Sequence, residues 1–202
     1  QFSKLSKDIL LIYSGYAQQI SLYLKNNPNN KSNIMLRTML TLKSEILNFI
    51  ETFINKSSKL DHATLIKEFV PAFLDTILGD YTKSIPLARQ ANCITTCNSL
   101  INQLGNNMEK YVPKIFASLF QTTLSMIKNS LDSLPDHRIA FFNFLYIVTK
   151  KCFSVFQKMN VEQIKLFINC VLWGIEHINP DICNISIQAL QEFLKQSQMI
   201  SN

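Results

Sequence analysis

Histidine and cysteine, the side chains that most often carry out chemistry in proteins, are spread thinly along this chain of 202 residues. His62, His137 and His177 lie far apart in the sequence, and none of them has a Cys, Asp or Glu nearby at the spacing of metal ligands. Cys93 and Cys97 are four residues apart, so on a helix they would share one face. A tetrahedral zinc site needs four ligands, and no second pair completes the set. We therefore expect both thiols to be core residues.

Nucleophilic catalysis and phosphate binding need arrangements that the sequence does not contain. Asp136 and His137 are adjacent, and adjacent residues on a helix do not face each other, so they do not form a catalytic dyad. The chain contains no G-x-S-x-G, Walker, G-x-G-x-x-G or H-E-x-x-H motif. Its four glycines are never clustered. These observations argue against an enzyme and predict neither a metal nor another cofactor.

Charge and composition restrict the class of protein further. The formal net charge is +6, but the 20 Lys and Arg residues are scattered, with Lys150-Lys151 as the only adjacent pair. A solvated basic surface is therefore favoured over a nucleic-acid site, which would need the cations to converge on one face. No apolar run reaches the roughly 18 residues needed to span a bilayer. We expect no direct contact with nucleic acid or membrane.

The cysteine count and the first residues indicate where the protein resides. Five cysteines, mostly within apolar stretches, fit reduced thiols in a cytosolic or nuclear protein better than a disulfide framework. The opening "QFSKLSKDIL" has no initiator Met and no signal-peptide layout. We expect the chain to be a piece of a longer protein.

Helical periodicity runs through nearly the whole chain and predicts an all-α protein. About eight helices are expected, beginning near residues 5, 33, 61, 90, 107, 135, 160 and 180. The first buried stripe is predicted at Leu5, Ile9, Ile12 and Tyr16. The second helix carries apolar residues at three- and four-residue spacing: Leu36, Met39, Leu42, Ile46, Phe49, Ile50 and Phe53.

Polar and proline residues mark where several helices begin. Asp61 and Asn179 are expected as N-caps, and Asn160 with Gln163 three residues later resembles a capping box. Pro135 fits a first helical position, where its missing N–H costs nothing. Gly105 is expected to end a helix in the left-handed conformation.

A repeated stretch decides between a helical bundle and a solenoid. "EFVPAFLDTILGDY" from residue 68 is echoed by "KYVPKIFASLFQTT" from residue 110, at an offset of 42 residues. That interval lies in the range of about 40–47 residues typical of HEAT and armadillo units. The sequence therefore predicts a single HEAT-repeat solenoid over 1–202, built from four antiparallel helix pairs at about 1–55, 56–105, 106–157 and 158–202. Pro71 should bend its helix, whereas Pro113 lies nearer a helix start.

Six blocks in order resemble a known family. They are "RTMLTLKSEILNFI", "EFVPAFLDTILGDYTKSIPLAR", "YVPKIFASLFQTTLSMI", "LPDHRIAFFNFL", "CFSVF" and "QIKLFINCVLWGIEHINPDICNISIQALQEFL". Together they are similar to the C-terminal portion of the nuclear export receptors of the karyopherin-β family. The resemblance covers almost the entire chain.

The resemblance implies a function and a set of partners. Members of this family are ring-shaped HEAT solenoids that bind Ran-GTP together with cargo carrying leucine-rich export signals. They shuttle between nucleus and cytoplasm, and Phe-Gly nucleoporins are thought to slot between their outer helices. The export-signal groove and the cysteine attacked by covalent inhibitors belong to a more N-terminal portion, so no cysteine here takes that role. A generic HEAT scaffold for another assembly is the alternative.

Basic residues on the inner helices are the candidate partner-binding residues. In this family the second helix of each pair lines the inner surface, so side chains off the apolar stripe there would meet acidic patches of a partner. The candidates are Arg37, Lys43, Arg89, Arg138 and Lys150. Each is otherwise an ordinary exposed cation, and Arg138 has a further interpretation as a brace for the loop at Pro135. Because the chain's ends cut through a stack, the isolated piece is also expected to associate with itself.

Overall fold

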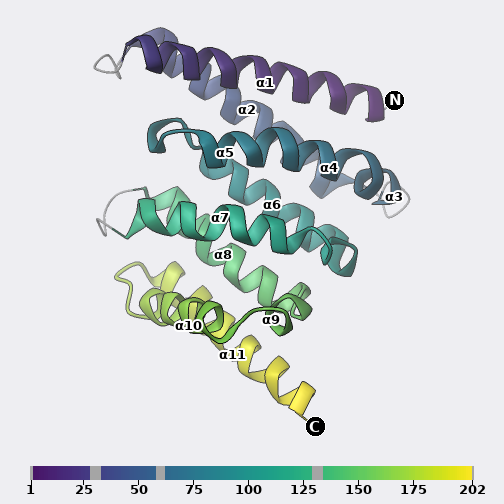
Figure 1. Ribbon diagram of the computed structural model, residues 1–202, viewed down its shortest axis with the longest axis vertical. Coiled ribbons are helices and arrows are strands. Elements are labelled where there is room, and N and C mark those ends of the chain that lie inside the picture. The colour runs from purple at the N-terminus through teal and green to yellow at the C-terminus, as the bar shows by residue number, and fades with distance from the viewer. Residues whose placement is uncertain (1, 28–32, 58–61, 129–133, 202) are drawn as a thin grey trace. The chain divides into compact units, whose positions relative to one another are not determined.

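The computed structural model describes residues 2–27, 33–57, 62–128 and 134–201, which fold into helices joined by short connections (Figure 1). No strand occurs in these ranges. The prediction of an all-α, HEAT-like protein is confirmed. The residues group into two compact units, Gln1–Thr96 and Cys97–Asn202, which are described separately. The assignment of four helix pairs to one solenoid stays a prediction.

The first unit contains two long helices and a third, interrupted one. Figure 1 shows α2 crossing α1, with the interrupted helix running beside α1. Its elements are α1 (Phe2–Asn26), α2 (Ile34–Lys56), α3 (His62–Thr64), the π-helix η2 (Leu65–Phe69), α4 (Val70–Phe73), the π-helix η3 (Leu74–Leu78), α5 (Gly79–Lys83), the 3₁₀ turn η4 (Pro86–Ala88) and the start of α6 (Ala91–Leu104). Asp61, the expected cap of this helix, lies outside the described residues.

Two π-helical turns flank Pro71 in the interrupted helix. Proline lacks an N–H and its ring clashes with the carbonyl four residues earlier, here that of Lys67. In η2 the N–H of Val70 donates to the carbonyl of Leu65, five residues back, so the turn before the proline is widened. Pro113 lies in the first turn of α7 (Val112–Ile127), where no such adjustment occurs. Pro71 lies inside a helix and Pro113 lies at the start of one, and this explains why π-helical turns flank only Pro71 of the two.

The buried face of α1 differs from the predicted stripe. Leu5 and Ile12 are 47% and 53% exposed, whereas Leu10, Tyr13 and Ile20 are buried. The predicted stripe therefore lies one residue too early. The apolar residues of α1 occupy more than one face, and the pattern alone gives no reason to prefer the face that holds Tyr13, whose hydroxyl has a partner elsewhere in the unit.

The same error occurs in α2. Leu42 and Phe49 are 40% and 52% exposed, while Lys43, Leu47 and Ile54 are buried. The predictions for Leu36, Met39 and Ile50 are confirmed. A hydrophobic pattern places every lysine outside, so it fails where a buried anion holds the lysine inside.

A row of hydrogen bonds joins α2 to the first residues of α6. Ser44 Oγ donates to Asn92 Oδ1 at 2.8 Å, and the side-chain amide of Asn92 donates to Asn48 Oδ1. Thr95 Oγ1 donates to Glu51 Oε2 at 2.7 Å. These polar groups fix the register between the two helices, because each needs its partner at one position along the other helix.

The second unit is built around aromatic rings. After the rest of α6 and the 3₁₀ turn η5 (Gly105–Met108), its elements are α7, α8 (Pro135–Lys151), α9 (Ser154–Gln157), α10 (Val161–Ile175) and α11 (Pro180–Ser201). Helix α8 packs against α7 and α11, and α10 packs against α11 (Figure 1). Phe156 lies between Phe116 and Phe167, with ring centroids 6.4 and 4.6 Å away. Such pairs stabilise a core beyond the area they bury.

Most of the predicted helix signals are confirmed. Asn160 and Gln163 form the capping box of α10, and Asn179 Oδ1 accepts the N–H of Asp181 at the start of α11. Pro135 is the first residue of α8. Gly105 has a positive φ of 51°, although a 3₁₀ turn follows it before the chain leaves the helix.

Candidate partner-binding groove

Two of the five predicted basic residues lie on the surface. Arg37 is exposed on α2, and Lys150 is exposed on α8. The ammonium of Lys150 donates to the hydroxyl of Tyr146 at 2.9 Å and lies 5.1 Å from the centre of its ring. That hydrogen bond raises the pKa of Lys150. Both side chains are in a position where a partner can reach them.

Lys43 is buried, so its predicted place off the apolar stripe is wrong. Its side chain is 1% exposed and its Nζ lies 2.6 Å from Asp80 Oδ2. The ammonium also donates to the carbonyl of Ala88 at 3.0 Å and lies 5.4 Å from the ring centre of Tyr13. A buried ammonium is tolerated only with such partners, and here they come from three different segments. Lys43 therefore holds the unit together from within.

Asp80 is the centre of this buried cluster. Its Oδ2 accepts from the hydroxyl of Tyr13 at 2.9 Å, and its Oδ1 accepts from Ser84 Oγ at 2.9 Å. Burial and then the charge of Asp80 raise the pKa of Tyr13 well above its ordinary value. The phenol consequently stays a neutral donor, and α1, α2 and α5 meet on one carboxylate.

Arg89 is half-buried and caps the end of α5. Its Nε donates to the carbonyl of Tyr81 at 3.0 Å, and its Nη2 lies 3.5 Å from the carbonyl of Thr82. The guanidinium also lies 5.9 Å from the ring centre of Tyr81. The last carbonyls of a helix lack intrahelical partners, so a cation placed there stabilises the helix end.

Arg138 is buried in the second unit, where its side chain joins helices, and its interpretation as a brace for the loop at Pro135 stays a prediction. Its side chain is 1% exposed, one nitrogen donates to the carbonyl of Ile127, and its guanidinium lies 5.6 Å from the ring centre of Trp173. These contacts tie the first turn of α8 to the last residue of α7 and to α10. The prediction that Arg138 is presented off the apolar stripe is wrong, because its neighbours offer a carbonyl and an aromatic face inside the core.

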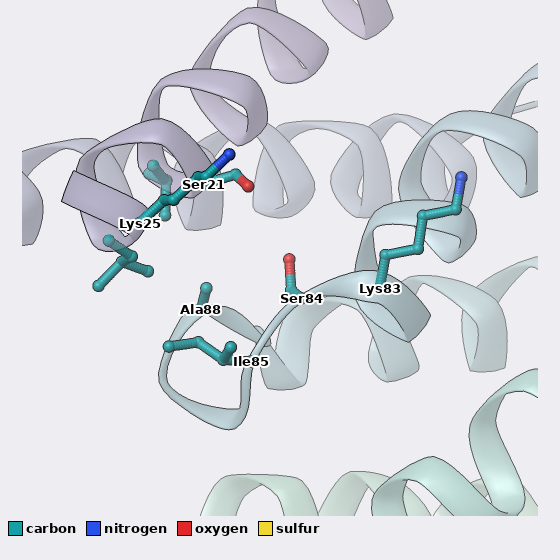
Figure 2. Close-up of a pocket in the computed structure, with 8 residues that line it drawn as sticks. Ser21, Lys25, Lys83, Ser84, Ile85 and Ala88 are labelled. Carbon is teal, nitrogen blue, oxygen red and sulfur yellow. The ribbon is translucent and has the colours of Figure 1, made fainter. Parts of the chain in front are cut away.

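A groove that sequence reasoning did not anticipate lies in the first unit, between the end of α1 and the η4 turn (Figure 2). Figure 2 shows Ser21 and Lys25 on α1, with Lys83, Ser84, Ile85 and Ala88 on the segment opposite. The groove has a volume of about 420 Å³ and is completed by Ile20 and Leu24. The lining residues come from segments that are far apart in the sequence and are brought together by folding. No local sequence motif therefore predicts the groove.

The buried cluster around Lys43 and Asp80 supports one wall of this groove. Lys43 holds the carbonyl of Ala88, and Asp80 holds the hydroxyl of Ser84, so both sides of the turn are tied to one ion pair. Ile20 and Ala88 also belong to a packed core cluster with Leu36 and Met39. The groove is therefore a preformed feature, since its base is fixed by buried contacts.

Metal-binding clusters and membrane-spanning helices are both missing from the described part of the chain. In these ranges no three His, Cys, Asp or Glu side chains gather to hold a metal ion. No described helix is both long enough and apolar enough to cross a membrane.

Comparison with known proteins places the chain in a family. Residues 1–202 match the family described as CRM1 C terminal. Exportin-1 of Dictyostelium discoideum is 34% identical over 195 residues, covering 96% of this chain and 18% of that protein. Protein EXPORTIN 1B of Arabidopsis thaliana is 33% identical over 199 residues, covering 98% of this chain and 18% of that protein. The chain thus spans about 18% of the length of these curated relatives, and it belongs to the CRM1 C-terminal family of the exportin-1 proteins.

Proposed function

We propose that this chain is the C-terminal scaffold and a partner-binding surface of a nuclear export receptor. The match to the CRM1 C-terminal family over residues 1–202, with a 34% identical exportin-1, is the observation that carries the proposal. The receptor binds Ran-GTP together with cargo that bears a leucine-rich export signal and carries the cargo out of the nucleus. It shuttles between nucleus and cytoplasm and contacts Phe-Gly nucleoporins on the way.

The polar clusters support a scaffold role for this portion. The ion pair of Lys43 and Asp80 and the buried guanidinium of Arg138 each join several helices. These groups hold helices in fixed positions, as a receptor needs if distant surfaces are to bind partners together. The export signal itself binds outside this portion, and the four helix pairs form one continuous solenoid within the receptor.

Exposed cations supply the partner-binding part of the proposal. Arg37 and Lys150 are the predicted residues that reach solvent, while Arg89 is partly committed to the end of α5. Exposed charges contribute little to affinity but steer the approach of a partner of opposite charge. We assign this steering role, toward acidic patches of Ran-GTP or cargo, to Arg37 and Lys150.

A chimeric receptor tests the proposal. The matching segment of the Dictyostelium exportin-1 is replaced by this chain, and a fluorescent reporter with a leucine-rich export signal is followed in cells that depend on the chimera. We expect the reporter to leave the nucleus as it does with the parent receptor. A matched chimera carrying an unrelated HEAT segment of similar length should leave the reporter nuclear. A folded chimera that binds Ran-GTP but no longer exports the reporter would instead favour a scaffold of another assembly.

A further inference from the structure

We propose that the groove between the end of α1 and the η4 turn docks a short acidic segment of a partner protein, one that carries an aliphatic or aromatic side chain. This docking site does not depend on the export function, because it rests on the groove alone. Three features of the groove support it: two cations without an acid, an apolar base, and a braced wall.

The first feature is an uncompensated positive charge. Lys25 and Lys83 line the groove from opposite sides, both are exposed, and none of the lining residues is acidic. Within the described ranges neither ammonium forms an ion pair. Two like charges beside one hollow raise the local concentration of anions, so carboxylates of a ligand are drawn to this place.

The second feature separates a peptide from a simple anion. The base of the groove consists of Ile20 and Ala88, which are almost fully buried, with Leu24 and the 46% exposed Ile85 beside them. A volume of about 420 Å³ is large enough for one big side chain with its flanking groups. A bare phosphate would leave this apolar surface in contact with water, whereas an apolar side chain between carboxylates covers it, which favours binding.

The third feature is the rigidity of the turn. Lys43 and Asp80 fix Ala88 and Ser84, as described above, and Ala88 N–H also donates to the carbonyl of Ile85 at 2.9 Å. A wall already held in its bound shape loses little conformational freedom on binding. The hydroxyl of Ser84 donates its hydrogen bond to Asp80, so the groove offers donors chiefly through the two ammonium groups and the exposed Ser21.

A neighbouring hollow gives the bound segment a direction. It has a volume of about 390 Å³, shares Ser21, Lys83 and Ser84 with the groove, and adds Asp75 and Asp80. The charge of Asp80 is matched by Lys43. The second hollow is lined by two carboxylates and the groove by none, so the acidic residues of the ligand belong at the Lys25 end of the groove.

A binding measurement with the intact receptor tests the inference. The probe is a short fluorescein-labelled peptide of Asp and Glu with a central Leu-Phe pair, and its anisotropy is followed at low and moderate salt. One control peptide has Asn and Gln in place of the acids, and a second has Ser-Ser in place of Leu-Phe. We expect both controls to bind about tenfold more weakly than the probe, and binding of the probe to weaken as salt screens the charges.

Receptor variants place the site. Lys25→Glu combined with Lys83→Glu should weaken probe binding about tenfold or more. Lys7→Glu combined with Lys67→Glu is the matched control, because both lysines are exposed in the same unit, outside the groove, and the net charge changes equally. That control should leave the affinity unchanged. Ser21→Trp, which fills the groove without changing its charge, should also abolish binding.

Several results would overturn the inference. Equal weakening by the two charge-reversed pairs would show attraction by net charge alone. Normal binding to the Ser21→Trp receptor would place the peptide elsewhere. Equal binding of the Ser-Ser peptide, or displacement of the probe by millimolar phosphate, would reduce the groove to an anion site. Because the readout is peptide binding, none of these results depends on whether the receptor exports cargo.

Discussion

At the scale of single residues, the informative group is the buried ammonium of Lys43. A charge withdrawn from water is stable only if its partners replace the lost hydration. Lys43 finds a carboxylate, a carbonyl and an aromatic face, all within the first unit. The same residue type at Lys150 stays in solvent. The difference lies in what surrounds each position after folding, and it decides which lysine is structural.

Removing the ammonium should therefore destabilise the protein. Lys43→Met keeps much of the side-chain volume but leaves Asp80 largely buried without its counter-charge, and we expect a loss of about 3 kcal/mol. Urea unfolding measures the change. Arg37→Met, on the exposed face of the same helix, should change stability by less than about 0.5 kcal/mol. In the double variant Lys43→Met with Asp80→Asn, part of the loss should return, since no unpaired charge is left behind.

The buried thiols allow a second prediction at this scale. Burial raises the pKa of Cys170 to about 12, and burial followed by the charge of Glu109 raises the pKa of Cys152 to about 11. The reactive thiolate is therefore scarce at both sites near pH 8. Alkylation of the native protein with iodoacetamide should label the half-buried Cys183 before either of them, as peptide mass mapping would reveal. Rapid labelling of Cys170 in the native protein would contradict its burial.

The same pKa shifts determine how the free energy of unfolding changes with pH. A thiol whose pKa is higher in the folded state than its ordinary 9.0 binds its proton more tightly when folded. The stability that this thiol contributes to the folded state is fully present below about pH 9 and is lost as the pH rises toward 12. Replacing Cys170 by Ala should flatten the alkaline end of the stability profile.

At the scale of elements, three helices approach one another closely at Gly174 of α10. A Cβ at this position would overlap Ser186 Oγ of α11 and the ring of Phe142 of α8. The three helices therefore pack this closely only because the residue has no side chain. Gly174→Ala should cost about 1–3 kcal/mol through overpacking, measured by thermal unfolding.

A second glycine provides the matched control. Gly15 lies inside α1, and a Cβ added there would meet nothing within 4 Å. Gly15→Ala should therefore stabilise the protein by about 0.5–1 kcal/mol, because alanine loses less backbone freedom in a helix. If both substitutions changed stability in the same direction, the close approach at Gly174 would not be the cause.

The elements also show what could be predicted from sequence. The capping box at Asn160 and the helix start at Pro135 depend on residues a few positions apart, so the local sequence contains the whole cause. The buried face of α2 depends on Asp80 and Ala88, about 40 residues away, so the pattern around Lys43 could not reveal it. The groove beside Lys25 and Lys83 was missed for the same reason, since its walls come from separate helices.

At the scale of the whole molecule, the net charge is +6, and the cations behind it have two different roles. Some are buried and stabilise the fold, whereas others are exposed on the surface. Lys43 and Arg138 lie inside the two units, and Arg89 is partly used at a helix end. Arg37 and Lys150 remain in solvent, one in each unit. The steering of partners proposed above therefore depends on exposed cations such as these two, which a partner can approach.

Reversing the two exposed charges tests the steering role proposed above. Arg37→Glu combined with Lys150→Glu in the complete receptor should slow association with Ran-GTP at low salt and leave dissociation nearly unchanged, because rim charges act on the approach of a partner. The difference from the parent should shrink at moderate salt, where the screening length falls to about 8–10 Å. Stopped-flow fluorescence at two salt concentrations measures both rates. Lys7→Glu combined with Lys67→Glu makes the same change in net charge on other exposed lysines and should slow association less. If the two pairs of reversals slowed association equally, the effect would belong to the overall charge of the receptor, and Arg37 and Lys150 would have no special place in partner binding.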